Sequence, residues 1–251
     1  TFKTIMENTN MNIGITTFLW SNNYGAVLQA HALQFFLQKR GHAVQIIDYR
    51  VKPPVTGLRK WIAKTPSGCV RKWETAYKEY IFESFRKRYL VLTPSVFDSV
   101  DGLESIGSYF DVVITGSDQV WNPNWLAQVE GFSDLYFLSF AGTQTRRISY
   151  AASIGHSEKA TMEEAWQKIL SEKLKQMDAI SVREASGIEL VSELCGRTDA
   201  VHVVDPTLLL DRTYYEKIAG KAKRKNGMIL NYMLHGLEQD ADEACRQIAE
   251  S

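Results

Sequence analysis

The sequence is poor in cysteine, has no net charge and lacks any long apolar run, and each absence excludes a class of protein. Its three cysteines are scattered without CxxC spacing, which argues against a disulfide framework or a zinc site and favours a reducing, cytoplasmic compartment. Lys and Arg (29) balance Asp and Glu (29), so no overall field draws the chain to nucleic acid. No stretch approaches the length of a transmembrane segment, and residues 1–10 lack the apolar centre of a signal peptide.

What the sequence does contain is an alternation of short β-branched segments with amphipathic ones. Gly41 and Gly196 end two of the amphipathic segments, as glycine commonly does at the end of a helix. Ser186 and Glu189 have the spacing of a capping box at the start of the helix that Gly196 ends. This alternation predicts an α/β fold, a doubly wound Rossmann-like parallel sheet, with strands at residues 12–18, 43–49, 111–115, 147–153, 179–183 and 201–205.

The same pattern predicts the domain organisation. Residues 1–11 are expected to be a disordered leader, and 12–206 an N-terminal Rossmann-like domain. A polar, lysine-rich stretch at 207–226 is expected to be a linker. Residues 227–251 hold one predicted strand and one predicted helix, which cannot bury their own apolar faces. We therefore expect them to be the start of an incomplete second domain.

Residues near 50–92 interrupt the alternation and are predicted to be a helical insertion that covers the sheet edge or shapes a cleft. Its basic, aromatic helix ends in the cluster FRKRY at 85–89. Such a cluster could contact phosphates, but a solvated helix face with aromatic residues packed beneath it is the favoured interpretation.

The most informative segment follows the strand at 111–115. The strand stops at Gly116, where a backbone without a side chain can pass close to a ligand, and the polar residues Ser117, Asp118 and Gln119 follow at once, with Trp121 just beyond. Ligands of open α/β sheets bind at the carboxyl ends of the strands. We predict Asp118 as a catalytic residue and Gly116, Ser117 and Gln119 as substrate-binding residues. The alternative is that Asp118 is only a turn residue.

A second polar loop, with Asn22, Asn23 and Tyr24, precedes a predicted helix whose N-terminal N–H groups favour an anion. These residues are candidate substrate ligands, or else the asparagines simply cap the helix. The loop is not a nucleotide-binding fingerprint, and the sequence indicates no cofactor and no metal site.

Arg183 ends a third apolar strand and is predicted to bind an anionic substrate. The alternative is a structural ion pair with its neighbour Glu184. Asp111 and Asp205 also flank strands and are expected to act in caps or turns. Among the histidines, His156 is a minor candidate for acid–base chemistry.

Together these segments resemble the polysaccharide pyruvyl transferase family. Each motif alone is weak, but their order and spacing are fairly specific and extend over nearly all of the chain from Met11 onward. The resemblance is carried by IGITTF at 13–18, NNYG at 22–25, LQA at 28–30, GSDQVWNP at 116–123, ISYAASIG at 148–155, ISVRE at 180–184 and VDPTL at 204–208.

The resemblance implies a GT-B-like two-domain enzyme of surface polysaccharide biosynthesis, of which this chain would be the first half. It implies transfer of the pyruvyl group of phosphoenolpyruvate to two hydroxyls of a saccharide or lipid-linked saccharide, which forms a ketal. It also implies a cytoplasmic location, with peripheral association with the inner face of the membrane as an alternative.

The sequence departs from this family in two places, and two other functions stay open. The first loop has no acidic residue, and nothing after Met228 matches the Ser-Phe-His motif whose histidine is the expected general acid. We therefore expect that acid in a second domain that is missing here, and an incomplete enzyme. The other functions are a non-catalytic saccharide-binding or interaction module and a GT-B glycosyltransferase that uses a nucleotide sugar.

Overall fold

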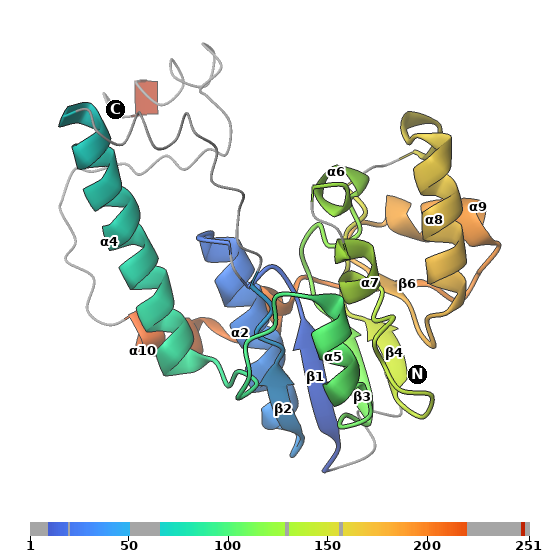
Figure 1. Ribbon diagram of the computed structural model, residues 1–251, viewed down its shortest axis with the longest axis horizontal. Helices are drawn as coiled ribbons and strands as arrows, with labels where there is room; N and C mark the ends of the chain where they lie inside the picture. Colours follow the sequence, from blue (N-terminus) through green and yellow to red (C-terminus); the bar gives the residue numbers. More distant parts are fainter. Residues whose placement is uncertain are drawn as a thin grey trace. The chain divides into compact units, whose positions relative to one another are not determined.

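The computed structural model describes residues 10–19, 21–50, 66–128, 131–155, 158–219 and 247–248. The chain divides into two compact units, Thr1–Leu210 and Asp211–Ser251. In the first unit, helices cover both faces of a parallel sheet (Figure 1). In the second unit, the described part includes the helix α10, Arg212–Ala219. His156, most of the predicted leader and nearly all of 227–251 lie outside the described residues.

The predicted parallel α/β sheet is confirmed. Four parallel strands lie in the order β2-β1-β3-β4, and β5 and β6 form a parallel pair beside them. Two bridges, from Ile148 to Ala179 and from Ala152 to Val182, link the pair to the edge at β4. The strands are β1 (Asn12–Thr16), β2 (Ala43–Ile46), β3 (Val112–Thr115), β4 (Arg146–Ser149), β5 (Ser181–Val182) and β6 (Val201–His202).

Alternate strand residues face two separate layers of core, as the period of a β-strand requires. Ile13 and Ile114 pack on the face covered by α2, and Val113 packs on the opposite face with α5, α7, α8 and α9. The helices are α2 (Tyr24–Gln38), α4 (Pro66–Tyr89), α5 (Val100–Gly107), α6 (Pro123–Leu126), α7 (Phe132–Tyr136), α8 (Glu164–Lys175) and α9 (Ser186–Cys195), with short 3-10 turns η1 (Lys159–Thr161) and η2 (Pro206–Leu209).

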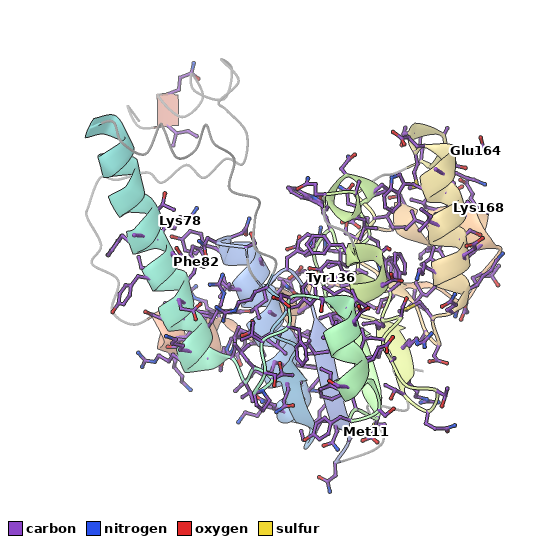
Figure 2. The ribbon with its side chains drawn as sticks, viewed as in Figure 1. Met11, Lys78, Phe82, Tyr136, Glu164 and Lys168 are labelled. Atoms are coloured by element: carbon purple, nitrogen blue, oxygen red, sulfur yellow. The ribbon has the colours of Figure 1, made fainter. Side chains whose placement is uncertain are left out.

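The described end of the region predicted as an insertion lies along the sheet edge at β2. After α4 the chain runs beside β2, where Leu92 bridges Ile46. The Gln34 amide of α2 fastens this segment, because it donates to the Val91 carbonyl (2.8 Å) and accepts from the Val91 N–H (3.0 Å). Phe82 of α4 is buried between α4 and α2 (Figure 2), so the helix is anchored by packing as well.

Several local predictions differ from the structure. The capping box at Ser186 is wrong, because Ser186 is already helical and Ala185 occupies the cap position without a side-chain bond. Gly196 does end that helix, in the left-handed conformation. The strand predicted at 147–153 stops at Ser149, since Ala151 has a φ of 52° and breaks the extended conformation. Residues 207–226, whose role as a linker stays a prediction, include part of η2 and all of α10.

Candidate functional site

The strand order changes direction between β1 and β3, and the carboxyl ends of these two strands are tied together. Thr17 donates from its hydroxyl to the Ser117 carbonyl (2.9 Å) and accepts from the Gln29 amide of α2 (2.7 Å). A Cβ on Gly116 would lie 3.3 Å from the Thr17 Cβ and 3.4 Å from Gln29 Oε1. Glycine therefore allows the close approach that forms this edge, and ligands of doubly wound folds bind at such a crossing.

Three side chains from three different strand ends meet beside this crossing. The Ser117 hydroxyl donates to Asp205 Oδ2 (2.7 Å), and Arg183 Nη1 lies 3.5 Å from Ser117 Oγ and 3.8 Å from Asp205 Oδ2. Arg183 also pairs with Glu184 through Nε (3.0 Å), and its side chain is 30% exposed. The structural pair that the sequence allowed is thus present, yet the guanidinium keeps an open side at the ligand edge of the sheet.

Asp118 lies next to this cluster in a strained conformation. Its φ is 129°, which is a rare backbone angle for a residue with a side chain. Its carboxylate accepts from the Gln119 N–H (2.8 Å). Burial raises the pKa of Asp118 and outweighs the lowering by that hydrogen bond and by the Arg183 charge. A strained, half-buried carboxyl with a raised pKa at a ligand edge is typical of an acid–base group.

Two residues of the cluster were missed by the sequence-based analysis. Asp205 was assigned to a cap, and it does accept from the Thr207 N–H (2.9 Å), but its other oxygen holds Ser117. Tyr150 is buried, and burial together with the Asp205 charge raises its pKa to about 12. The phenol is therefore neutral at physiological pH. Neither residue carries a local signal, because both reach the site through long-range packing.

Gln119 and Trp121 have structural partners. Gln119 Oε1 accepts from Asn122 Nδ2 (2.9 Å) and from Trp125 Nε1 (3.0 Å). Trp121 is fully buried, donates to the Tyr136 carbonyl (3.1 Å) and belongs to the core. Both residues hold the loop after Ser117 in place, and a ligand role for Gln119 stays a prediction.

The first loop is built around the start of α2. Asn23 Oδ1 accepts from the N–H groups of Gly25 (2.8 Å) and Ala26 (3.3 Å), which confirms the capping alternative for this residue. Tyr24 is 55% exposed and contacts Phe82, with ring centroids 5.0 Å apart. Within the described residues, the hydrogen bonds of this loop run to α2 and α4, so its part in ligand binding stays a prediction.

Arg86 of α4 was predicted to lie on a solvated face, and that interpretation is wrong. The residue is 5% exposed, and its Nη2 donates to the Ser21 carbonyl (3.0 Å) and to Asn22 Oδ1 (3.2 Å). Burial lowers its pKa despite the neighbouring Glu83. Arg86 thus fixes the loop that precedes α2, and only its neighbours Lys87 and Arg88 are exposed.

Removal of the Asn23 cap is expected to lower the stability of the protein. Asn23→Ala leaves two N–H groups of α2 without their acceptor, so we expect unfolding free energy to fall by about 1 kcal/mol. Chemical denaturation of the two proteins measures the difference. Asn23→Ser, which restores an acceptor, should recover most of it; equal loss in both variants would contradict the capping role.

No group of three or more His, Cys, Asp or Glu side chains in the described part of the chain could hold a metal ion. Among the same residues, no helix is both long and apolar enough to cross a bilayer.

A comparison with curated proteins gives no match. The family model for polysaccharide pyruvyl transferase matches residues 23–249, which include every element from α2 onward. The chain therefore belongs to the polysaccharide pyruvyl transferase family.

Proposed function

We propose that the protein transfers the pyruvyl group of phosphoenolpyruvate to two hydroxyls of a saccharide or lipid-linked saccharide, as a cytoplasmic step of surface polysaccharide synthesis. The observation that carries this proposal is the Arg183 guanidinium, held by Ser117 and Asp205 beside the strained Asp118. The sheet would form one half of a GT-B-like enzyme, working in the cytoplasm or at the inner face of the membrane.

The donor is a small polyanion, and Arg183 suits it. A guanidinium binds carboxylate and phosphate groups with paired N–H donors. Gly116 and Ser117 are buried at this edge, and the Ser117 hydroxyl contributes by donating to Asp205 (2.7 Å) and by lying 3.5 Å from the guanidinium. Asp205 and Glu184 hold the guanidinium but leave it partly exposed, so it can exchange partners with an arriving anion.

The chemistry needs a base and an acid. One sugar hydroxyl adds to C2 of the enolpyruvyl group and loses its proton, and the methylene carbon gains a proton. The second hydroxyl then displaces phosphate at C2, and its proton leaves with the phosphate. Asp118 is the proposed base, because a raised pKa strengthens a carboxylate as a proton acceptor. The family resemblance implies a histidine of a second domain as the acid.

The test is phosphate release from phosphoenolpyruvate by the full-length protein, with a panel of methyl hexopyranosides as acceptors and calorimetric titration of phosphoenolpyruvate alongside. Release that depends on both substrates supports the proposal. Absence of phosphate release together with absence of phosphoenolpyruvate binding overturns it. Turnover of nucleotide sugars instead would identify a glycosyltransferase, and saccharide binding without any turnover would identify a binding module.

A further inference from the structure

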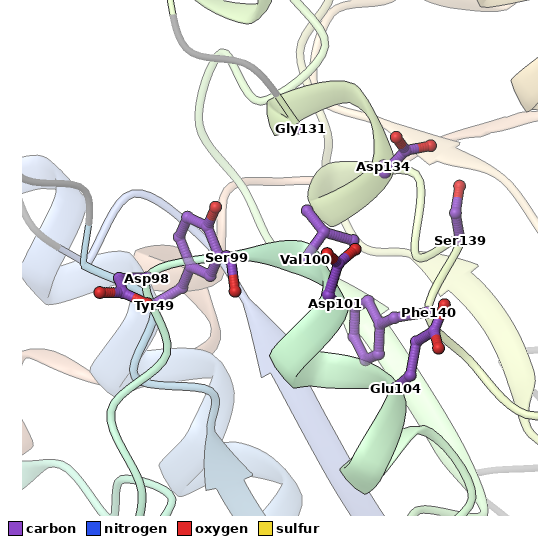
Figure 3. Close-up of a pocket in the computed structure, with 10 residues that line it drawn as sticks. All are labelled: Tyr49, Asp98, Ser99, Val100, Asp101, Glu104, Gly131, Asp134, Ser139 and Phe140. Atoms are coloured by element: carbon purple, nitrogen blue, oxygen red, sulfur yellow. The ribbon is translucent and has the colours of Figure 1, made fainter.

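A cavity of about 650 Å³ opens on the sheet face opposite α2, and we call it the acidic cavity (Figure 3). Its volume is within the range of small-molecule sites. It lies toward the carboxyl ends of the strands, because Tyr49 follows β2 there and both α5 and α7 begin there. Its lining includes Tyr49, Asp98, Ser99, Asp101, Glu104 and Asp134.

Tyr49 is the feature of the acidic cavity that points to a ligand. The residue is 5% exposed and its ring packs edge-on against Phe132, with centroids 6.4 Å apart. Within the described structure its hydroxyl has no hydrogen-bond partner, although it lines the cavity beside Ser99 (Figure 3). Burial and the Asp98 charge raise the pKa of Tyr49, so the hydroxyl stays protonated and available as a donor. A hydroxyl that opens on a cavity without a protein partner is available to hydrogen-bond a ligand.

The charges of the acidic cavity restrict what that partner is. Four carboxylates line it, and Asp134 is paired with Lys173. Within the described residues neither Asp101 nor Glu104 has an ion pair. An anion such as phosphoenolpyruvate would be repelled. The carboxylates are also not grouped for a metal ion in the described part of the chain. A neutral ligand with many hydroxyl donors fits, because carboxylates accept hydrogen bonds strongly.

We infer that the acidic cavity binds a sugar residue of the saccharide acceptor. The inference rests on the proposed function, which requires a saccharide acceptor. Hydroxyls of the sugar would donate to Asp101 and Glu104, and one would accept from the Tyr49 hydroxyl. The α7 wall of the cavity also supports the loop after Ser117, because the Tyr136 carbonyl accepts from Trp121. The cavity wall and the loop that follows Ser117 are therefore joined through α7.

The experiment uses ligand-observed NMR on the full chain with methyl glycosides of glucose, galactose, mannose and N-acetylglucosamine. At least one should bind. Tyr49→Phe, which removes only the hydroxyl, and Glu104→Gln should each weaken that binding about 3- to 10-fold, as loss of a hydrogen bond predicts. Phosphoenolpyruvate affinity should not change in either variant.

Two matched controls isolate the cavity: Tyr109→Phe, at a tyrosine that is 60% exposed, and Glu172→Gln, at an exposed glutamate of α8. Neither should affect glycoside binding, and all four variants should melt as the parent does; should Tyr49→Phe not fold, Asp101→Asn replaces it. Binding of no glycoside, or equal binding by cavity and control variants, overturns the inference. Phosphoenolpyruvate turnover is measured separately, so a failed acceptor site and a failed transferase proposal give different results.

Discussion

Asp118→Asn is expected to lower turnover by about 10²- to 10⁴-fold, the range for loss of a general base. The amide keeps the size of the side chain and its contact with the Gln119 N–H, but it cannot take a proton. The variant should be at least as stable as the parent. Burial raises the pKa of Asp118, so its ionised carboxylate destabilises the folded state of the parent. Steady-state phosphate release and thermal unfolding of the same preparation measure both effects.

Asp111→Asn is the matched control, since Asp111 lies at the opposite end of the same strand. Its carboxylate accepts from the Asn12 N–H (2.8 Å), far from the ligand edge. Turnover should survive in this variant. If Asp118→Asn instead unfolds the protein and Asp111→Asn does not, Asp118 is a turn residue and the catalytic assignment fails.

The raised pKa of Asp118 also fixes the direction of two pH effects. As pH falls through this pKa, the base is protonated and kcat/KM drops, at a higher pH than for an ordinary aspartate. The stability effect has the opposite sign. No penalty exists below the unfolded-state pKa, and the penalty is complete only above the raised folded-state pKa. The stability gain in Asp118→Asn should therefore be present at neutral pH and vanish in acid.

The sequence was sufficient to predict the sheet and its ligand edge, because buried parallel strands are short, β-branched and end abruptly. Ser117 and Arg183 both follow such strands, so the sequence was enough to place them at the same edge of the sheet. The contact of Asp205 with Ser117 could not be predicted, since the two residues are 88 positions apart in the chain and their contact depends on where η2 packs. Burial of Arg86 likewise depends on how α4 docks on α2, a property of the tertiary structure that a charge pattern does not encode.

The two proposed sites differ in charge in the way that their ligands do. The donor site offers a guanidinium at Arg183, whereas Asp101 and Glu104 give the acidic cavity a negative field. An anion is therefore drawn to one site and repelled from the other. A neutral saccharide is free to enter either, but finds hydroxyl acceptors concentrated in the cavity. This separation would limit binding of the donor in the acceptor site.

Arg183→Ala is expected to weaken phosphoenolpyruvate binding by about 2–4 kcal/mol, roughly 30- to 1000-fold, because it removes the paired donors and leaves Asp205 uncompensated. Arg183→Lys keeps the positive charge but loses the paired N–H donors of the guanidinium, so its affinity for phosphoenolpyruvate should lie between those of the parent and of Arg183→Ala. Calorimetric titration measures both. Arg212→Ala, at an arginine whose side chain is 85% exposed, is the control and should bind as the parent does.

A purely structural Arg183 predicts a different outcome. Its pair with Glu184 is partly exposed, and such pairs contribute only about 0–1 kcal/mol to stability. Unchanged affinity in Arg183→Ala would then assign the residue to that pair. The pH profile gives an independent measurement, because the Arg183 charge lowers the pKa of Asp118 whereas Asp205 raises it. As pH falls, the residual turnover of Arg183→Ala should therefore decline at a higher pH than that of the parent. An acidic limb at the same pH in both proteins would show that Arg183 does not act on the Asp118 carboxylate.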